Sequence, residues 1–276
     1  MATASRGAER TMIAFLDGPD DLSIDNIIHS TAGASAYGFR GALVGGVTVY
    51  GWTVPAILDV IDHGWLDHGW VDVAFRRPVY PGDRLLTRVL PRADGTAELA
   101  MTNQDGDRCL VGTVGSGTAP WLGELSLPGR RLAEDRPPVL PSLTMEVAPV
   151  WQDLRPQAVP IPIADAAEYA IEKQHDPDEL WTGPHARIHP GWVAGRMTRL
   201  IHHSYDYGPS IHTRSQIQHL APAFAGQTIT MAGRFVDAFE QKGHHYAVVD
   251  GVMLAQDGQE LARLRHTTIF RVARRG

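Results

Sequence analysis

The sequence predicts an α+β protein in which one helix followed by four short antiparallel strands occurs twice, with each sheet wrapped around its helix. Three observations lead to this prediction. The same short motifs return in the second half of the 276-residue chain at a nearly constant separation. Each half has one helical segment that begins directly after a glycine-containing entry. Short alternating runs bounded by turn residues then follow each helix.

The repeat is one of motif order more than of residue identity. The segments "GALVGGVTVYGW", "RRPVYPGDRL" and "TNQDGDRCL" of the first half correspond to "ARIHPGWVAGRM", "LAPAFAGQTI" and "LAQDGQELA" of the second. Gly46 and Gly191 are 145 residues apart, and Gly82 and Gly226 are 144 apart. The last pair of motifs is 152 residues apart, which predicts a longer hairpin in the second half. Matches in the same order indicate a structural repeat.

The two helices are expected over residues 47–61 and 190–205. Pro190 suits the first position of the second helix, and Gly208 lies beyond its end as a stop signal. Pro55 falls inside the first helix, where its ring removes a hydrogen bond, so we expect a bend there.

The strands are expected as alternating runs separated by turn signals. Asp105-Gly106 and Asp257-Gly258 are typical of tight hairpin turns, in which Asp and Gly tolerate a positive φ. Four such runs follow the second helix, at residues 210–220, 228–239, 245–255 and 261–272.

A proline-rich and charged segment divides the chain. Residues 123–143 show little periodicity and are interpreted as a linker. We therefore expect an N-terminal repeat over residues 1–122 and a C-terminal repeat over residues 144–276.

The composition indicates a soluble cytoplasmic protein. Hydrophobic residues make up 43% of the chain and charged residues 20%, which is ordinary for a globular protein. The net charge of −6 comes without a long block of either sign, so nucleic acids and anionic membranes are not expected partners. The start of the chain lacks the apolar core of a signal peptide. The single cysteine, Cys109, cannot form an internal disulfide and fits a reducing compartment.

The repeated elements resemble those of the MaoC-like double hot-dog proteins, which include (R)-specific enoyl-CoA hydratases and acyl-thioester dehydratases. The resemblance covers nearly the whole chain. It rests on "NIIHSTAGASAYGFRGALVGG" before the first helix, "RPVYPGD" after it, and "HPGWVAGRM" and "PAFAGQT" at the matching points of the second half. The resemblance implies a double hot-dog fold and an acyl-pantetheine thioester as the ligand, lying along the helix entry. It implies no metal and no organic cofactor.

The resemblance also implies a set of site residues. The family signature is Asp-x-Asn-Pro-x-His, and on this chain His29 falls on the histidine and Asn26 on the asparagine. Ile24 and Ile27 occupy the aspartate and proline positions, whereas Asp25 is one residue away and could serve after a slip in the loop. We expect His29 and Asp25 to be catalytic.

The glycine entry is expected to bind the thioester carbonyl. The backbone N–H groups at a helix start have no partner inside the helix, and the helix dipole favours negative charge there. Gly45 and Gly46 lack a Cβ that would block the carbonyl. Val44 precedes them, so the expected substrate-binding set is Asn26, Val44, Gly45 and Gly46.

The second half departs further from the signature. In "HDPDELW", Asp176 falls at the aspartate position and Trp181 at the histidine position. We expect this half to be the non-catalytic partner, although His175, Asp176 and His189 keep a role in the chemistry open for it. The 13 histidines lack a His-Glu-x-x-His motif, so no metal site is expected.

Three functions remain open from the sequence. The first is an acyl-thioester hydratase or dehydratase acting on an enoyl- or 3-hydroxyacyl thioester, in which His29 activates water and helix-entry amides stabilise the enolate oxygen. The second is a hot-dog thioesterase driven by a carboxylate. The third is a non-catalytic acyl-thioester-binding protein. The carrier is either CoA or an acyl-carrier protein, and the chain is either a monomer or a homodimer.

Overall fold

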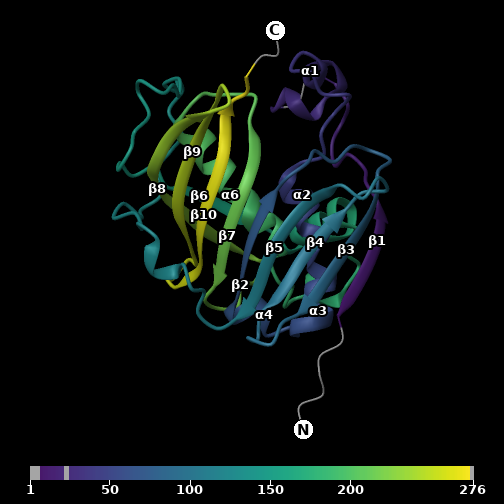
Figure 1. The fold of residues 1–276 in the computed structure, drawn as a ribbon. Helices are drawn as coiled ribbons and strands as arrows, with labels where there is room; N and C mark the ends of the chain where they lie inside the picture. The colour runs from purple at the N-terminus through teal and green to yellow at the C-terminus, as the bar shows by residue number, and fades with distance from the viewer. Residues whose placement is uncertain (1–6, 22–24, 274–276) are drawn as a thin grey trace.

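The computed structural model describes residues 7–21 and 25–273. Its centre is one antiparallel sheet of ten strands, in the order β1-β3-β4-β5-β2-β7-β10-β9-β8-β6. Figure 1 shows the sheet running across the molecule, with its central helices against one face. The position of Ile24, at which the family aspartate is missing, lies outside the described residues.

The first half contributes five strands and the helices that precede and separate them. The elements are β1 (Ala8–Ile13), the 3-10 helix η1 (Ile27–His29), α1 (Thr31–Ser35), α2 (Gly46–Gly51), α3 (Val54–Ile61), α4 (Trp65–His68), β2 (Gly69–Phe75), β3 (Arg84–Pro91), β4 (Ala97–Thr102) and β5 (Arg108–Ser116).

The second half repeats the same order after a long connection that holds the short helix η2 (Leu122–Glu124). Its elements are β6 (Gln157–Ile161), α5 (Ile163–Glu168), the π-helix η3 (Tyr169–Lys173), the 3-10 helix η4 (Glu179–Trp181), α6 (Pro190–Ser204), β7 (Ile211–His219), β8 (Gln227–Gln241), β9 (His244–Leu254) and β10 (Glu260–Arg271).

The strand order of one half mirrors that of the other. If β1 is matched with β6, and β2 to β5 with β7 to β10, both halves have the same connectivity. The halves join where β2 pairs with β7, with Val71 opposite Ile217. Gly82 and Gly226, at the 144-residue separation, have φ values of 87° and 85° in the turns before β3 and β8. The motif spacing therefore reflects equivalent turns in equivalent connections.

The strands that follow each helix agree with the sequence pattern, but each half also has a fifth strand in front of its helix. β1 and β6 pair at the two outer edges of the sheet, on β3 and β8. The sequence pattern does not reveal these two edge strands. Both strands are short, and their residues are mostly exposed or half-buried, so they show little of the apolar alternation that marks a half-buried strand.

The helices begin and end close to where the sequence predicts. α6 starts at Pro190, and His189 caps it by accepting a hydrogen bond from the Gly191 N–H group at 3.1 Å. The first helix is interrupted at the expected place: α2 ends at Gly51 and α3 begins at Val54, with Pro55 in its first turn. Trp52, after α2, keeps right-handed helical dihedrals, so the two segments follow one path.

α2 and α6 cross at a pair of glycines. A Cβ on Gly191 would lie 3.1 Å from the Cα of Gly51, and one on Gly195 would lie 3.7 Å from the Val47 side chain. This close approach places the start of α2 beside the middle of α6. The N-terminal end of the first-half helix therefore borders on side chains of the second half.

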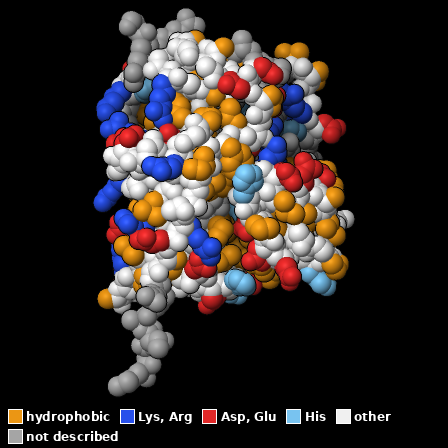
Figure 2. Space-filling view, turned by 90° about the vertical axis from the view of Figure 1, so that its right-hand side faces the viewer, with side chains coloured by type: hydrophobic (Ala, Val, Ile, Leu, Met, Phe, Trp, Pro, Cys, Tyr) orange, Lys and Arg blue, Asp and Glu red, His pale blue; other side chains and the backbone are white. Residues whose placement is uncertain are grey.

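Charged side chains of both signs are interspersed with apolar ones on the face shown in Figure 2. No helix within the described residues is both long and apolar enough to cross a bilayer.

Candidate functional site

A cavity of about 1350 Å³ lies at the start of α2. Its walls come from the loop that precedes α2, from α6, and from the first residues of β7. All six site residues predicted from the sequence line this cavity. They are Asp25, Asn26, His29, Val44, Gly45 and Gly46. The cavity is therefore the candidate site, and both halves of the chain form it.

His29 ends the short helix η1 and is held by backbone and side-chain contacts. Its Nδ1 lies 2.7 Å from the carbonyl oxygen of Leu43. Because a carbonyl oxygen only accepts, Nδ1 donates this bond, and the lone pair of the neutral ring is on Nε2. The Asn26 Nδ2 lies 3.3 Å from Nε2. The ring is thereby held in the tautomer that a general base requires.

Asn26 is oriented by the second half of the chain. Its Nδ2 donates to the Ser210 carbonyl oxygen at 2.8 Å, and its Oδ1 accepts from the Ser210 N–H group at 3.2 Å. This reciprocal pair fixes which end of the amide faces His29, since the reverse orientation would oppose like partners. The loop that carries the histidine is thus attached to the residue directly before β7.

The entry to α2 is open and next to the histidine. No side chain caps Gly45, and the N–H groups of Thr48 and Val49 bond back to its carbonyl oxygen. Within the described residues, the N–H groups of Gly46 and Val47 have no hydrogen-bond partner. A Cβ on Gly45 would lie 3.8 Å from the Cε1 of His29. The uncapped amides and the imidazole therefore border the same space.

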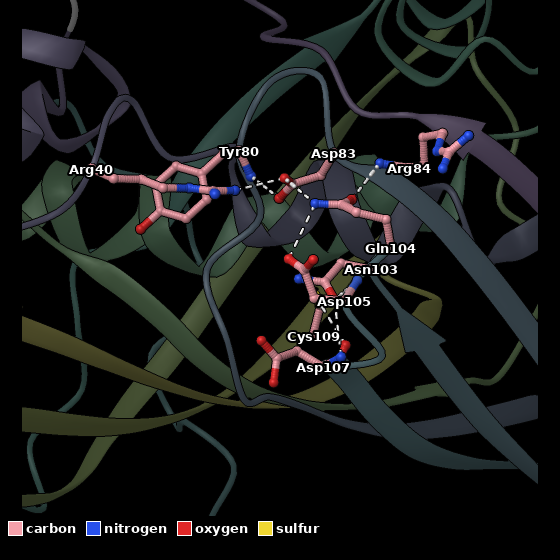
Figure 3. A network of polar contacts seen from close by, with 9 residues as sticks. All are labelled: Arg40, Tyr80, Asp83, Arg84, Asn103, Gln104, Asp105, Asp107 and Cys109. Carbon is pink, nitrogen blue, oxygen red and sulfur yellow. Dashed lines mark hydrogen bonds and ion pairs between the residues drawn. The ribbon is translucent and has the colours of Figure 1, made fainter.

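Asp83 of the "PGD" turn connects this turn to the loop before α2, and Figure 3 shows its contacts with Arg40, Tyr80 and Gln104. The buried carboxylate of Asp83 accepts hydrogen bonds from the Tyr80 N–H group at 2.9 Å, from Gln104 at 3.3 Å and from Arg40 at 2.6 Å. The Arg40 guanidinium also lies 4.1 Å from the centre of the Tyr80 ring. Since Arg40 belongs to the loop between His29 and Gly45, the motif positions the site without entering it.

Asp25 has a different partner from the expected one. Its carboxylate forms an ion pair with Arg199 at 3.1 Å, and its side chain is 86% exposed. The ring nitrogens of His29 contact Leu43 and Asn26 instead. Asp25 therefore lies at the rim of the cavity, and the expected Asp25–His29 pair is not the arrangement that forms.

A carboxylate that the sequence did not nominate lies on the other side of the α2 entry. Asp17 lines the cavity, and its Oδ2 accepts a hydrogen bond from the Thr48 hydroxyl at 2.9 Å. A Cβ on Gly45 would lie 3.5 Å from that hydroxyl. Thr48 and His29 thus flank the same glycine, with Asp17 behind Thr48. The second half holds Asp17 through Lys173, whose Nζ donates to the Asp17 carbonyl oxygen at 2.6 Å.

Asp20, the next acid along the chain, has a structural role. Its carboxylate accepts hydrogen bonds from the N–H group and the hydroxyl of Thr31, at 2.5 and 2.7 Å. The backbone bond from Thr31 lowers the pKa of Asp20. This carboxylate therefore fixes the start of α1.

Basic residues outnumber acidic ones around the cavity. Six lining residues are Arg or Lys and three are Asp. A further histidine, His212, lies close to Gly46, and burial lowers its pKa to about 4. His212 is thus neutral at physiological pH and adds no charge. The cavity therefore favours an anionic ligand.

Cys109 does not contribute a nucleophile. Its thiol is buried, and burial followed by the nearby Asp83 and Asp107 raises its pKa to about 11. The thiolate is therefore scarce at neutral pH.

The equivalent helix entry in the second half is closed. The ring of the buried His189 caps α6, and its Nε2 lies 3.6 Å from Asp176. The ring also packs on Trp181, with 4.7 Å between ring centres. Burial lowers the pKa of His189, and Asp176 offsets part of that effect. These contacts fill the entry of α6, whereas the entry of α2 has no side-chain cap.

Comparison with known proteins gives a fold and no closer relationship. No protein-family model matches the chain, and no curated protein matches it.

Within the described residues, no group of three or more His, Cys, Asp or Glu side chains is arranged to hold a metal ion.

Solved structures resemble the chain over most of its length. A MaoC-like dehydratase has a TM-score of 0.60 at 18% identity, covering 97% of this chain and 98% of that one. A Mycobacterium tuberculosis protein essential for survival during infection, with a double hot-dog fold, has a TM-score of 0.59 at 13% identity, covering 91% and 87%. A Lactobacillus plantarum protein provisionally assigned as an oleoyl thioesterase has a TM-score of 0.53 at 9% identity, covering 99% of both chains.

These similarities establish the fold. The chain has the double hot-dog fold of these structures, as the resemblance implied. At such low identity the reaction has to be argued from the site.

Proposed function

We propose that this protein is an acyl-thioester hydratase or dehydratase, acting on an enoyl- or 3-hydroxyacyl group carried by CoA or a carrier protein. One observation carries the proposal: the Nε2 side of His29, the uncapped amides of Gly46 and Val47, and the Asp17 carboxylate all border one cavity. Hydration needs a base for water, a proton donor for the α-carbon, and donors for the enolate oxygen.

Each group has a role in the hydration direction. His29 takes a proton from water as the water oxygen bonds to the β-carbon. The electron pair of the double bond moves toward the carbonyl, and the Gly46 and Val47 N–H groups stabilise the resulting enolate oxygen. The α-carbon then receives a proton from the protonated carboxyl group of Asp17, which Thr48 orients. The imidazolium of His29 returns a proton to Asp17 before the next turnover, so the protons balance. Dehydration is the same sequence in reverse. Preorganised oxyanion donors contribute about 3–4 kcal/mol in other enzymes.

The charge of the cavity supports a phosphorylated carrier. Both CoA and the pantetheine arm of a carrier protein hold phosphate groups, and arginines bind phosphate through paired N–H groups. Five of the six basic lining residues are exposed, which suits contact with phosphates at the cavity mouth. These five are Arg76, Arg77, Arg136, Arg199 and Lys242.

The test is replacement of His29 by glutamine. We expect the rate of hydration of a trans-enoyl-CoA, followed by loss of the enoyl-thioester absorbance, to fall by roughly 10²- to 10⁴-fold. The matched control is His185→Gln, because His185 is exposed and lies outside the cavity. Thermal unfolding of both variants monitors the fold. Unchanged turnover in the His29 variant would remove this residue from the mechanism.

A thioesterase is the second candidate. The similarity to the Lactobacillus protein supports it, and a carboxylate such as Asp17 could direct water at the carbonyl carbon. Release of free thiol, measured with a thiol reagent, separates the two reactions because hydration releases none. Tight binding of acyl-CoA with neither reaction would instead support a non-catalytic binding protein.

A further inference from the structure

Arg196 differs from the other half-buried arginines of the described residues. There are seven of these, and six form an ion pair with an Asp or Glu side chain. The six are Arg131, Arg155, Arg187, Arg234, Arg263 and Arg265. Among the described residues, no carboxylate pairs with Arg196.

The contacts of Arg196 leave the end of its side chain free. Its Nε donates to the Trp192 carbonyl oxygen at 3.3 Å, and its guanidinium lies 4.0 Å from the centre of the Trp192 ring. The terminal amino groups of the guanidinium have no partner within the described residues, yet they are not sealed off, because Arg196 lines the cavity. A guanidinium fixed against an indole with open donors is arranged to bind a carboxylate.

The surroundings raise the cost of leaving this charge unpaired. Burial, followed by the neighbouring Arg199, lowers the pKa of Arg196 to about 10. Arg199 itself is paired with Asp25 at the rim. Arg196 remains charged at neutral pH, and a half-buried charge is stabilised when an anion reaches it.

The location of Arg196 favours the acyl chain over the carrier. Gly195, the residue before it on α6, packs on Val47 in the first turn of α2, and Arg196 lines the same cavity. Its charge also interacts with the half-buried Tyr169, and the Tyr169 hydroxyl interacts with Asp17. The other basic residues of the cavity are exposed, whereas Arg196 is half-buried in its wall.

We propose that Arg196 binds a carboxylate on the acyl group, so that the preferred substrate is the monothioester of an unsaturated or hydroxylated dicarboxylic acid. This inference rests on the proposed function for the reaction, but the binding preference does not depend on turnover.

The kinetic test uses matched thioesters. CoA esters of trans-α,β-unsaturated acids of several chain lengths are compared with their ω-carboxylated counterparts, in the parent protein and in Arg196→Gln. We expect the parent to prefer one carboxylated substrate in kcat/KM. The variant should lose roughly 10- to 100-fold on that substrate and little on its neutral partner, as expected for a hydrogen-bonded charge pair. The control is Arg88→Gln, whose exposed side chain lies on β3 away from the cavity.

A second arm separates the acyl carboxylate from the carrier phosphates. The same acyl groups are offered as N-acetylcysteamine thioesters, which hold no phosphate. A selectivity that persists on these esters and disappears in Arg196→Gln supports the proposal. An equal loss on neutral and carboxylated CoA esters, with no effect on the phosphate-free esters, would assign Arg196 to the carrier and overturn it.

A binding arm keeps the proposal testable if no thioester is turned over. Calorimetric titration compares adipyl-CoA and hexanoyl-CoA as saturated probes of equal chain length. Tighter binding of adipyl-CoA to the parent, lost in Arg196→Gln, supports the carboxylate site even if the reaction proposed above is wrong. Equal affinities for both probes in the parent protein would overturn it.

Discussion

At the scale of single residues, the two central helices differ in what precedes their first turn. Gly45 leaves the start of α2 without a side-chain cap, whereas the His189 ring accepts the Gly191 N–H group at the start of α6. The same structural unit therefore presents free donors in one half and satisfied donors in the other. A glycine at this position stabilises a helix by only a few tenths of a kcal/mol less than a polar cap, so the open end of α2 costs little stability.

Replacement of Asp17 by asparagine should test the newly found carboxylate. If Asp17 delivers a proton, kcat should fall by roughly 10²-fold or more, because the amide cannot exchange a proton at neutral pH. Thr48→Val removes only the hydroxyl that orients Asp17, so a smaller loss is expected. Steady-state kinetics on a trans-enoyl-CoA measure both. A full rate in the Asp17 variant would show that another group protonates the α-carbon.

The sequence indicated some site residues and not others. The resemblance pointed to His29, Asn26 and the glycine pair because they lie within one loop. Asp17 and Ser210 line the cavity because the fold brings segments from outside this loop against it. Ser210 is 184 residues from its partner Asn26. No local pattern encodes such a contact.

At the scale of elements, the short helix η1 determines where His29 lies. Its Ile28 packs against Ala34 and Leu43 in a small hydrophobic cluster that is separate from the main core. Gly33 makes this packing possible, because a Cβ there would lie 2.1 Å from the Ile27 carbonyl oxygen. The backbone of α1 at Gly33 therefore packs directly on the backbone of η1 and fixes its position.

Gly33→Ala should displace η1 and reduce activity more than stability. The clash is with backbone, so it cannot be relieved by a side-chain rotation, and overpacking of this kind costs about 1–3 kcal/mol. We expect a modest drop in the unfolding free energy and a severe loss of turnover. Gly123→Ala is the control, since nothing lies within 4 Å of a Cβ there. Denaturant unfolding and kinetics on both variants check this, and a fully active Gly33 variant would contradict it.

The sequence predicts the ends of helices where a residue such as proline strongly restricts the backbone. Pro190 and the Pro55 interruption were visible because proline restricts its own backbone. The edge strands β1 and β6 had no such signal, and their pairing depends on neighbours far along the chain. The sequence thus predicted the repeat and its helices better than the outer limits of the sheet.

At the scale of the whole molecule, the buried His219 and His266 and the half-buried His212 couple stability to pH. Burial lowers the pKa of His219 and of His212 to about 4, and that of His266 well below its usual value. Their ordinary pKa is 6.5. Between these limits the unfolded chain binds more protons than the folded one. The contribution of these histidines to the free energy of unfolding is therefore complete above pH 6.5 and is lost as the pH falls toward 4.

Unfolding free energy should decrease below pH 6.5 by up to about 1.4 kcal/mol per pH unit for each such histidine. His219→Leu removes one of these titrations, so its plot of stability against pH should be shallower. Denaturant titrations at a series of pH values measure both slopes. Parallel curves for the parent and the variant would show that His219 is protonated as readily in the folded state as in the unfolded one.

The attachment of the histidine loop to Ser210, and of Asp17 to Lys173, affects which changes in the second repeat the site can tolerate. The Asn26 amide bonds the backbone of Ser210, so these two bonds constrain the path of the chain before β7 and not the identity of the residue there. Lys173 uses its own ammonium group, so its replacement would release the segment that carries Asp17. The repeat with the closed helix entrance thus constrains the open entrance of the other repeat through three hydrogen bonds.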